Sequence, residues 1–118
     1  MADESGVLVL GDLTAGALSL TSLELLAAGR GLADSLGQEL AIGVFGATLD
    51  QPSSQAISHG ADKVYAVTHP LLGDYQVDLH LTAMEALVKE ANPSIVLIGR
   101  TNQGRELAPR LAFRLGVG

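Results

Sequence analysis

The segment richest in chemistry-bearing residues lies near the end of the chain and reads Gly-Arg-Thr-Asn-Gln-Gly-Arg-Glu over positions 99–106. Gly99 and Gly104 have the spacing of the two glycines in a phosphate-binding loop, and an apolar run precedes them. Such a loop needs Lys and then Ser or Thr after the second glycine, because these groups hold the terminal phosphates and magnesium. Arg105 and Glu106 stand there instead. The segment therefore disfavours nucleotide hydrolysis.

Two interpretations of this segment remain. The free amides at the start of a helix could receive an anion, which makes Gly99, Thr101, Gly104 and Arg105 weak candidates for an anion or nucleotide pocket. Alternatively, the glycines only permit a tight turn between a strand and a helix. The tight turn is the favoured interpretation, so we expect no cofactor to be held here with any strength.

The other polar residues show no pattern that predicts catalysis or metal binding. Gly11 is followed at once by Asp12, whose charge would oppose a phosphate, and no Gly-x-Gly-x-x-Gly fingerprint surrounds it. His59, His69 and His80 lack metal-ligand spacing and are interpreted as unrelated loop or surface residues. The serines lie in expected caps and loops, without a nucleophile elbow. We therefore predict no catalytic residue and no metal.

Basic residues gather toward the end of the sequence. Four of the seven lysines and arginines lie at or after position 100: Arg100, Arg105, Arg110 and Arg114. On a helix, Arg110 and Arg114 share one face while Leu107 and Leu111 lie on another. The arginines could form a solvated face. They could also meet carboxylates or phosphates at a domain or subunit boundary, and we predict that role for Arg105 and Arg110.

Apolar runs alternate with helical patterns along the whole chain. Short apolar runs predict four strands at 7–10, 40–45, 63–67 and 95–99, the third of which is the least apolar and is expected at an edge. Helical spacing predicts four helices, the first capped by Thr21 and the last running from Gly104 to Leu115. The order βαβαβαβα predicts an α/β fold, a doubly wound, Rossmann-like parallel sheet covered on both faces.

Composition bounds the protein class. A chain of 118 residues with 47% hydrophobic residues and a mean hydropathy of +0.33 is expected to form one globular domain. The absence of cysteine excludes disulfides and thiolate metal sites. No apolar run is long enough for membrane insertion, and a net charge of −6 disfavours nucleic acid. Because residues 1–6 also lack the basic start of a signal peptide, the cytoplasm is the expected compartment.

The last segment resembles a known family. Positions 99–116 resemble the Thr-x-x-Gly-Arg-x-Leu-x-Pro-Arg-x-Ala pattern of the electron transfer flavoprotein alpha-subunit family. The pattern falls on Thr101, Gly104, Arg105, Leu107, Pro109, Arg110 and Ala112. The VLVLGD opening, the LTSLELLAAGRGLA helix, GADKVYAV and NPSIVLIG are similar as well. The resemblance covers essentially all of residues 1–118 and concerns the family's N-terminal domain.

The resemblance implies a scaffold role within an electron carrier rather than an enzyme in its own right. Alpha and beta subunits of this family form a heterodimer that carries electrons from flavin dehydrogenases, such as the acyl-CoA dehydrogenases of fatty acid β-oxidation, to a quinone oxidoreductase or another acceptor. FAD sits mainly in a C-terminal domain that these residues lack. The implied fold is a three-layer sandwich of the adenine nucleotide alpha hydrolase-like type. The resemblance also implies that this domain contacts the beta subunit. We expect this chain alone to bind neither FAD nor AMP tightly.

An alternative from another class is a stand-alone adenine-nucleotide-binding module of the universal-stress type. That module needs closely spaced glycines after the last strand and then a Gly-Ser or Gly-Thr pair. Here Gly99 and Gly104 are widely spaced and the chain ends Gly116-Val117-Gly118, which counts against it. A further strand would be expected after this point, so we expect the chain to be a piece of a longer protein.

Overall fold

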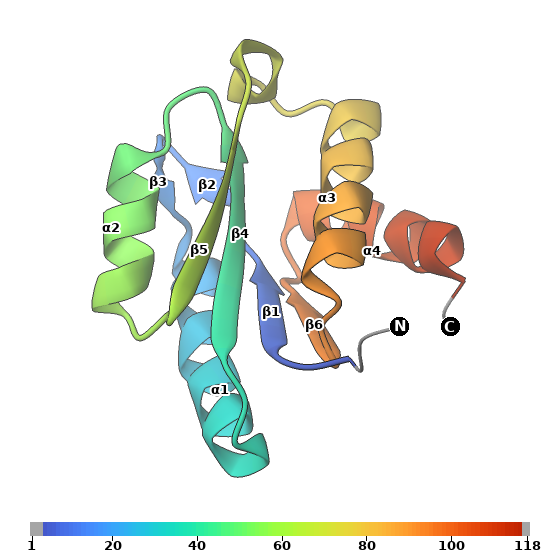
Figure 1. The fold of residues 1–118 in the computed structure, drawn as a ribbon. Coiled ribbons are helices and arrows are strands. Elements are labelled where there is room, and N and C mark those ends of the chain that lie inside the picture. The colour runs from blue at the N-terminus through green and yellow to red at the C-terminus, as the bar shows by residue number, and fades with distance from the viewer. Residues whose placement is uncertain (1–3, 117–118) are drawn as a thin grey trace.

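The fold is built on a four-stranded parallel sheet with strand order β5-β4-β1-β6 (Figure 1). The computed structural model describes residues 4–116, so part of the acidic start and the final Val-Gly lie outside it. The strands are β1 (Val7–Leu10), β4 (Leu40–Gly46), β5 (Lys63–Thr68) and β6 (Ile95–Ile98). All three pairings are parallel, and β5 is an edge strand, as its sequence predicts.

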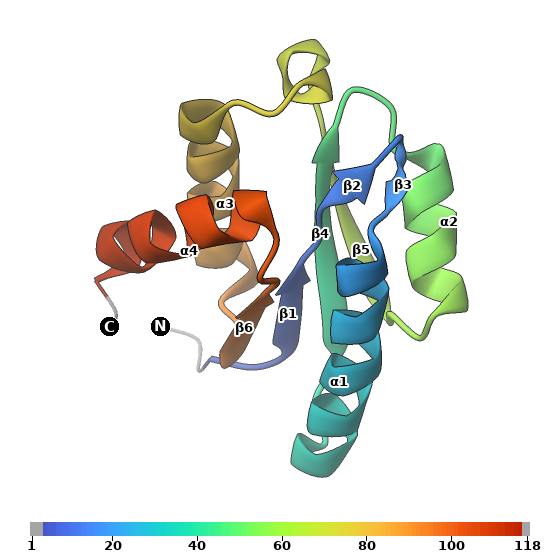
Figure 2. The same ribbon diagram turned by 180° about the vertical axis from the view of Figure 1, so that it is seen from behind.

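Helices cover both faces of the sheet, which confirms the predicted doubly wound sandwich. Helices α1 (Leu20–Leu36) and α2 (Asp50–Ser58) pack on one face, and α3 (Val77–Ala91) and α4 (Asn102–Leu115) pack on the other (Figures 1 and 2). No helix among residues 4–116 is long and apolar enough to cross a membrane.

Two apolar clusters fill the space between the layers. Successive side chains of a strand point to opposite faces, so Val7 and Val9 join the cluster under α1 and α2, and Leu8 and Leu10 join the cluster under α3 and α4. All four are buried. A strand buried on both faces must be apolar at every position, which is why β1 reads as a continuous run.

Two glycines of helix α1, Gly29 and Gly31, differ in how they pack against the sheet. A Cβ atom at Gly29 would lie 2.8 Å from Leu40 Cδ1, so Gly29 does allow close packing on β4. A Cβ atom at Gly31 would have no neighbour within 4 Å, so Gly31 does not contribute to this packing.

The structure corrects the predicted ends of two helices. The N-cap of α1 is Ser19 rather than Thr21: Ser19 Oγ accepts a hydrogen bond from the amide of Ser22 at 3.0 Å. The last helix begins at Asn102, two residues before Gly104, because Thr101 caps it. In both cases a hydroxyl just before the helix satisfies an amide that has no partner within the helix.

Two small elements were not predicted. Strands β2 (Leu13–Thr14) and β3 (Ala17–Leu18) form an antiparallel hairpin after β1, with positive φ angles at Ala15 and Gly16. A two-residue hairpin with both central residues in this conformation usually carries Asn-Gly or Asp-Gly, so Ala-Gly gave no clear signal. A 3₁₀ helix, η1 (Pro70–Gly73), follows β5 and packs near the end of β4.

Candidate functional site

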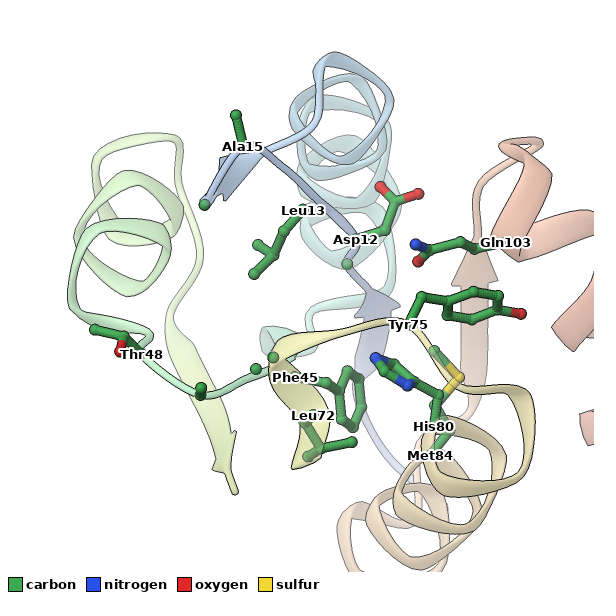
Figure 3. Close-up of a pocket in the computed structure, with 15 residues that line it drawn as sticks. Asp12, Leu13, Ala15, Phe45, Thr48, Leu72, Tyr75, His80, Met84 and Gln103 are labelled. Carbon is green, nitrogen blue, oxygen red and sulfur yellow. The ribbon is translucent and has the colours of Figure 1, made fainter. Parts of the chain in front are cut away.

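A cavity of about 410 Å³ opens at the carboxyl edge of the sheet (Figure 3). Its walls come from the loops after β1 and β4, from η1, from the first turns of α3, and from Gln103 at the start of α4. Ligands of open parallel sheets bind beyond the carboxyl ends of the strands, so the cavity lies where a binding site is expected.

Asp12 forms one wall of the cavity and is held in place by the start of α1. Asp12 Oδ1 accepts hydrogen bonds from the hydroxyls of Ser19 and Ser22, and the Asp12 amide donates to Ser22 Oγ at 2.9 Å. Within residues 4–116, Asp12 Oδ2 accepts no hydrogen bond. The site therefore holds a fixed carboxylate with one oxygen still able to accept, beside the favourable N-terminal end of a helix dipole.

Three rings form another wall. The ring centroids of Tyr75 and His80 are 5.2 Å apart in an edge-on arrangement, and those of Phe45 and His80 are 6.5 Å apart. His80 Nδ1 lies 3.0 Å from the carbonyl oxygen of Gln76 and 3.3 Å from the Gln76 amide nitrogen. Burial lowers the pKa of His80 below its ordinary value of 6.5, so this ring is uncharged at neutral pH. The wall is aromatic and carries no net charge.

A hydrogen bond ties this aromatic wall to α4. Tyr75 Oη donates to Glu106 Oε1 at 2.7 Å, across 31 positions of sequence. Burial, together with the neighbouring Glu106 carboxylate, raises the pKa of Tyr75 to about 12, so the phenol keeps its proton. This contact fixes the segment between η1 and α3 over the cavity.

The turn singled out by its glycines is packed shut. Thr101 Oγ1 accepts from the Gly104 amide at 3.0 Å, and the Arg105 amide donates to the Thr101 carbonyl oxygen at 2.9 Å. The space left between this turn and β1 is about 10 Å³, no more than one water molecule fills. The structure brings Gly99, Thr101 and Gly104 together but leaves the Arg105 side chain exposed. A weak anion site here stays a prediction, with two of its amides already bonded.

The predicted arginine cluster divides into two parts. Arg114 Nη1 lies 3.5 Å from Glu85 Oε1 on α3 and is therefore bound within the domain. Arg105 and Arg110 are exposed, and within residues 4–116 neither guanidinium makes a salt bridge or a hydrogen bond. Their role at an interface stays a prediction.

An aromatic side chain, Phe113, lies beside Arg110 on the same helix. Phe113 is 87% exposed, the largest exposed fraction among the large apolar side chains described. It borders a groove of about 370 Å³ between α3 and α4, lined by Asp78, Leu81, Pro109, Arg110, Phe113 and Arg114. We call Arg105, Arg110 and Phe113 together the α4 surface.

Sequence reasoning missed the aromatic wall. Phe45, Tyr75 and His80 all line the cavity, and no pattern in the sequence brought the three together. The interpretation of the histidines as loop or surface residues fits the exposed His59 and His69 and is wrong for His80, which is 7% exposed. A signal existed: His80 lies four residues before Met84 and so belongs to the apolar stripe of α3. Among residues 4–116, no three side chains of the metal-binding types are grouped to hold a metal.

Comparison with known proteins gives the family. Residues 7–118 match the family described as Electron transfer flavoprotein domain. The chain is 41% identical, over 99% of its length, to "Electron transfer flavoprotein subunit alpha" of Clostridium acetobutylicum. It is 39% identical over 87% of its length to "Acryloyl-CoA reductase electron transfer subunit beta" of Anaerotignum propionicum, and 40% identical over 87% to "Protein FixB" of Azorhizobium caulinodans.

These relatives are much longer proteins. The chain covers 35% of the Clostridium protein, 28% of the Anaerotignum protein and 29% of the Azorhizobium protein, or about a third of each. The match supports the resemblance seen in the sequence and favours it over the universal-stress alternative. The fold, the arginine-bearing last helix and these comparisons agree that the chain belongs to the electron transfer flavoprotein family.

Proposed function

We propose that this chain is the N-terminal domain of an electron transfer flavoprotein alpha subunit and that it serves as a platform for a beta subunit. The α4 surface carries this proposal. An exposed aromatic ring beside two exposed arginines without partners has the composition of a subunit contact, because aromatic residues and Arg are enriched in interfaces.

The chemistry of the α4 surface also defines the partner. A guanidinium presents donors in a planar fork that fits a carboxylate, so the partner should offer Asp or Glu side chains opposite Arg105 and Arg110. Phe113 should enter an apolar depression between them. Arg114, already bonded to Glu85, is not expected to take part.

The wider electron path is part of the same proposal. FAD would be held mainly by a further domain of the longer subunit, and electrons would pass from a flavin dehydrogenase to a quinone oxidoreductase or another acceptor. Relatives named as electron transfer subunits support this. The absence of cysteine and the acidic charge are consistent with the cytoplasm, which we propose as the compartment.

Calorimetric titration with the electron transfer flavoprotein beta subunit of the same organism tests the proposal. We expect the double variant Arg105→Ala, Arg110→Ala to bind at least tenfold more weakly, since truncating a paired charge at an interface leaves its partner desolvated. Lys63→Ala, which removes one positive charge from edge strand β5, is the control and should bind like the unaltered chain. Equal affinity for all three proteins would show that the arginines form only a solvated face.

A further inference from the structure

We propose that the cavity at the carboxyl edge of the sheet binds an uncharged molecule of nucleoside size, with a heteroaromatic ring and hydroxyl or amine donors. This inference rests on the cavity alone and does not depend on the α4 surface or on a beta subunit. Its basis is the combination of volume, aromatic walls and a single fixed carboxylate (Figure 3).

The size and walls of the cavity suit a flat ring. A volume of about 410 Å³ falls within the range of small-molecule sites, roughly 300–1,000 Å³. Phe45, Leu72 and Met84 give it an apolar floor, and Tyr75 and His80 stand beside them. Rings of this kind favour stacked or edge-on contact with another ring. Because Tyr75 is tied to Glu106, this wall is already in place without a ligand.

The charge of the cavity selects against anions. Of the 15 residues that line it, only Asp12 carries a formal charge at neutral pH, since His80 is uncharged there. The described lining contains no Lys or Arg that could balance a phosphate. A phosphate in this space would meet the Asp12 carboxylate in a partly desolvated setting, where like charges repel strongly.

The polar groups favour a ligand that donates hydrogen bonds. Asp12 Oδ1 is occupied by Ser19 and Ser22, which orients the carboxylate and leaves Oδ2 to accept from a hydroxyl pair or an amine. The Gln103 amide points toward Asp12 and can both donate and accept (Figure 3). The neighbouring crevice between β1 and β6 is closed, so the ligand would lie over the ends of β1 and β4.

Titration of the full 118-residue chain with adenosine and with AMP at pH 7 tests the proposal, with affinity measured by calorimetry and location by amide chemical shifts. We expect adenosine to shift the amides of the loops after β1 and β4 and to bind at least tenfold more tightly than AMP. The proposal is overturned if saturating adenosine shifts none of these amides, or if AMP binds as tightly as adenosine.

A pair of lysine substitutions on one helical turn separates the effect of the cavity's charge from that of overall charge. Gln103→Lys places a cation opposite Asp12, so the preference for adenosine over AMP should shrink to about twofold or reverse. Asn102→Lys adds the same charge at an exposed neighbouring position outside the cavity lining and should keep the tenfold preference. An equal change in both variants would overturn selection by Asp12, and circular dichroism confirms that each variant is folded.

Discussion

Two turns at the same edge of one sheet have opposite designs. The turn after β6, at 99–104, carries the glycines of a phosphate-loop spacing, yet it closes on a space of about 10 Å³. The turn after β1 carries a carboxylate and no such motif, yet it borders a cavity of about 410 Å³. Glycine spacing alone therefore does not predict a ligand site. In the turn after β6, the capping side chain Thr101 already uses the Gly104 amide that a ligand would need.

Alanine at Gly104 should have the largest effect on stability. A Cβ atom there would lie 1.8 Å from the Gly99 carbonyl oxygen, which is backbone and cannot move aside. We expect Gly104→Ala to lower the free energy of unfolding by at least about 3 kcal/mol, measured by urea denaturation. Gly31→Ala is the matched control because its Cβ would meet nothing within 4 Å, and it should raise stability by about 0.5–1 kcal/mol. Equal changes in the free energy of unfolding for Gly104→Ala and Gly31→Ala would contradict the description of this turn as closed.

Loss of the cap on the same turn should have a smaller effect. Thr101→Val keeps the shape of the side chain but removes the oxygen that accepts from the Gly104 amide. The expected loss of unfolding free energy is about 1 kcal/mol, as for other N-caps. Thr68→Val is the control, because Thr68 lies at the exposed end of β5 and its side chain makes none of the described hydrogen bonds; it should change stability little. If Thr101→Val is as stable as Thr68→Val, the amide has found another partner and the turn is less closed than described.

The smallest expected effect concerns the cavity wall and is a change in how stability depends on pH. The pKa of His80 is below 6.5 in the folded chain, so the unfolded chain binds the extra proton first as the pH falls. Stability contributed by the neutral ring is present above pH 6.5 and is lost as the pH falls through the folded pKa. His80→Gln should therefore show a shallower loss of stability between pH 7 and pH 5. A slope in His80→Gln equal to that of the unaltered chain would contradict the buried, uncharged ring.

Much of the fold follows from the sequence, because continuous apolar runs and helical stripes are local signals. The four long strands, the four long helices and the edge position of β5 all agree with the prediction. The cap of α1 does not, because Ser19 and Thr21 are both suitable caps in the local sequence. Asp12, seven residues before Ser19, bonds to its hydroxyl in the folded chain. The contact that selects Ser19 as the cap is therefore a tertiary one, and a local sequence pattern does not contain it.

The cavity could not be predicted either, because it too depends on contacts between distant parts of the chain. Its walls come from five parts of the chain, and Tyr75 reaches its position through a bond to Glu106, 31 residues away. Only His80 gave a readable signal, through its place on the apolar stripe of α3. For the α4 surface, the sequence pointed to Arg105 and Arg110, because basic residues gather near the end of the chain. The exposed Phe113 was not part of that prediction.

The most direct test of the proposed platform role is hydrogen–deuterium exchange of the chain, alone and with the beta subunit. If the α4 surface is the contact, amide exchange should slow in α4 on binding and stay unchanged in α2, which covers the opposite face of the sheet. Protection in α2 with unchanged exchange in α4, or no protection in either helix from a bound beta subunit, would contradict the account.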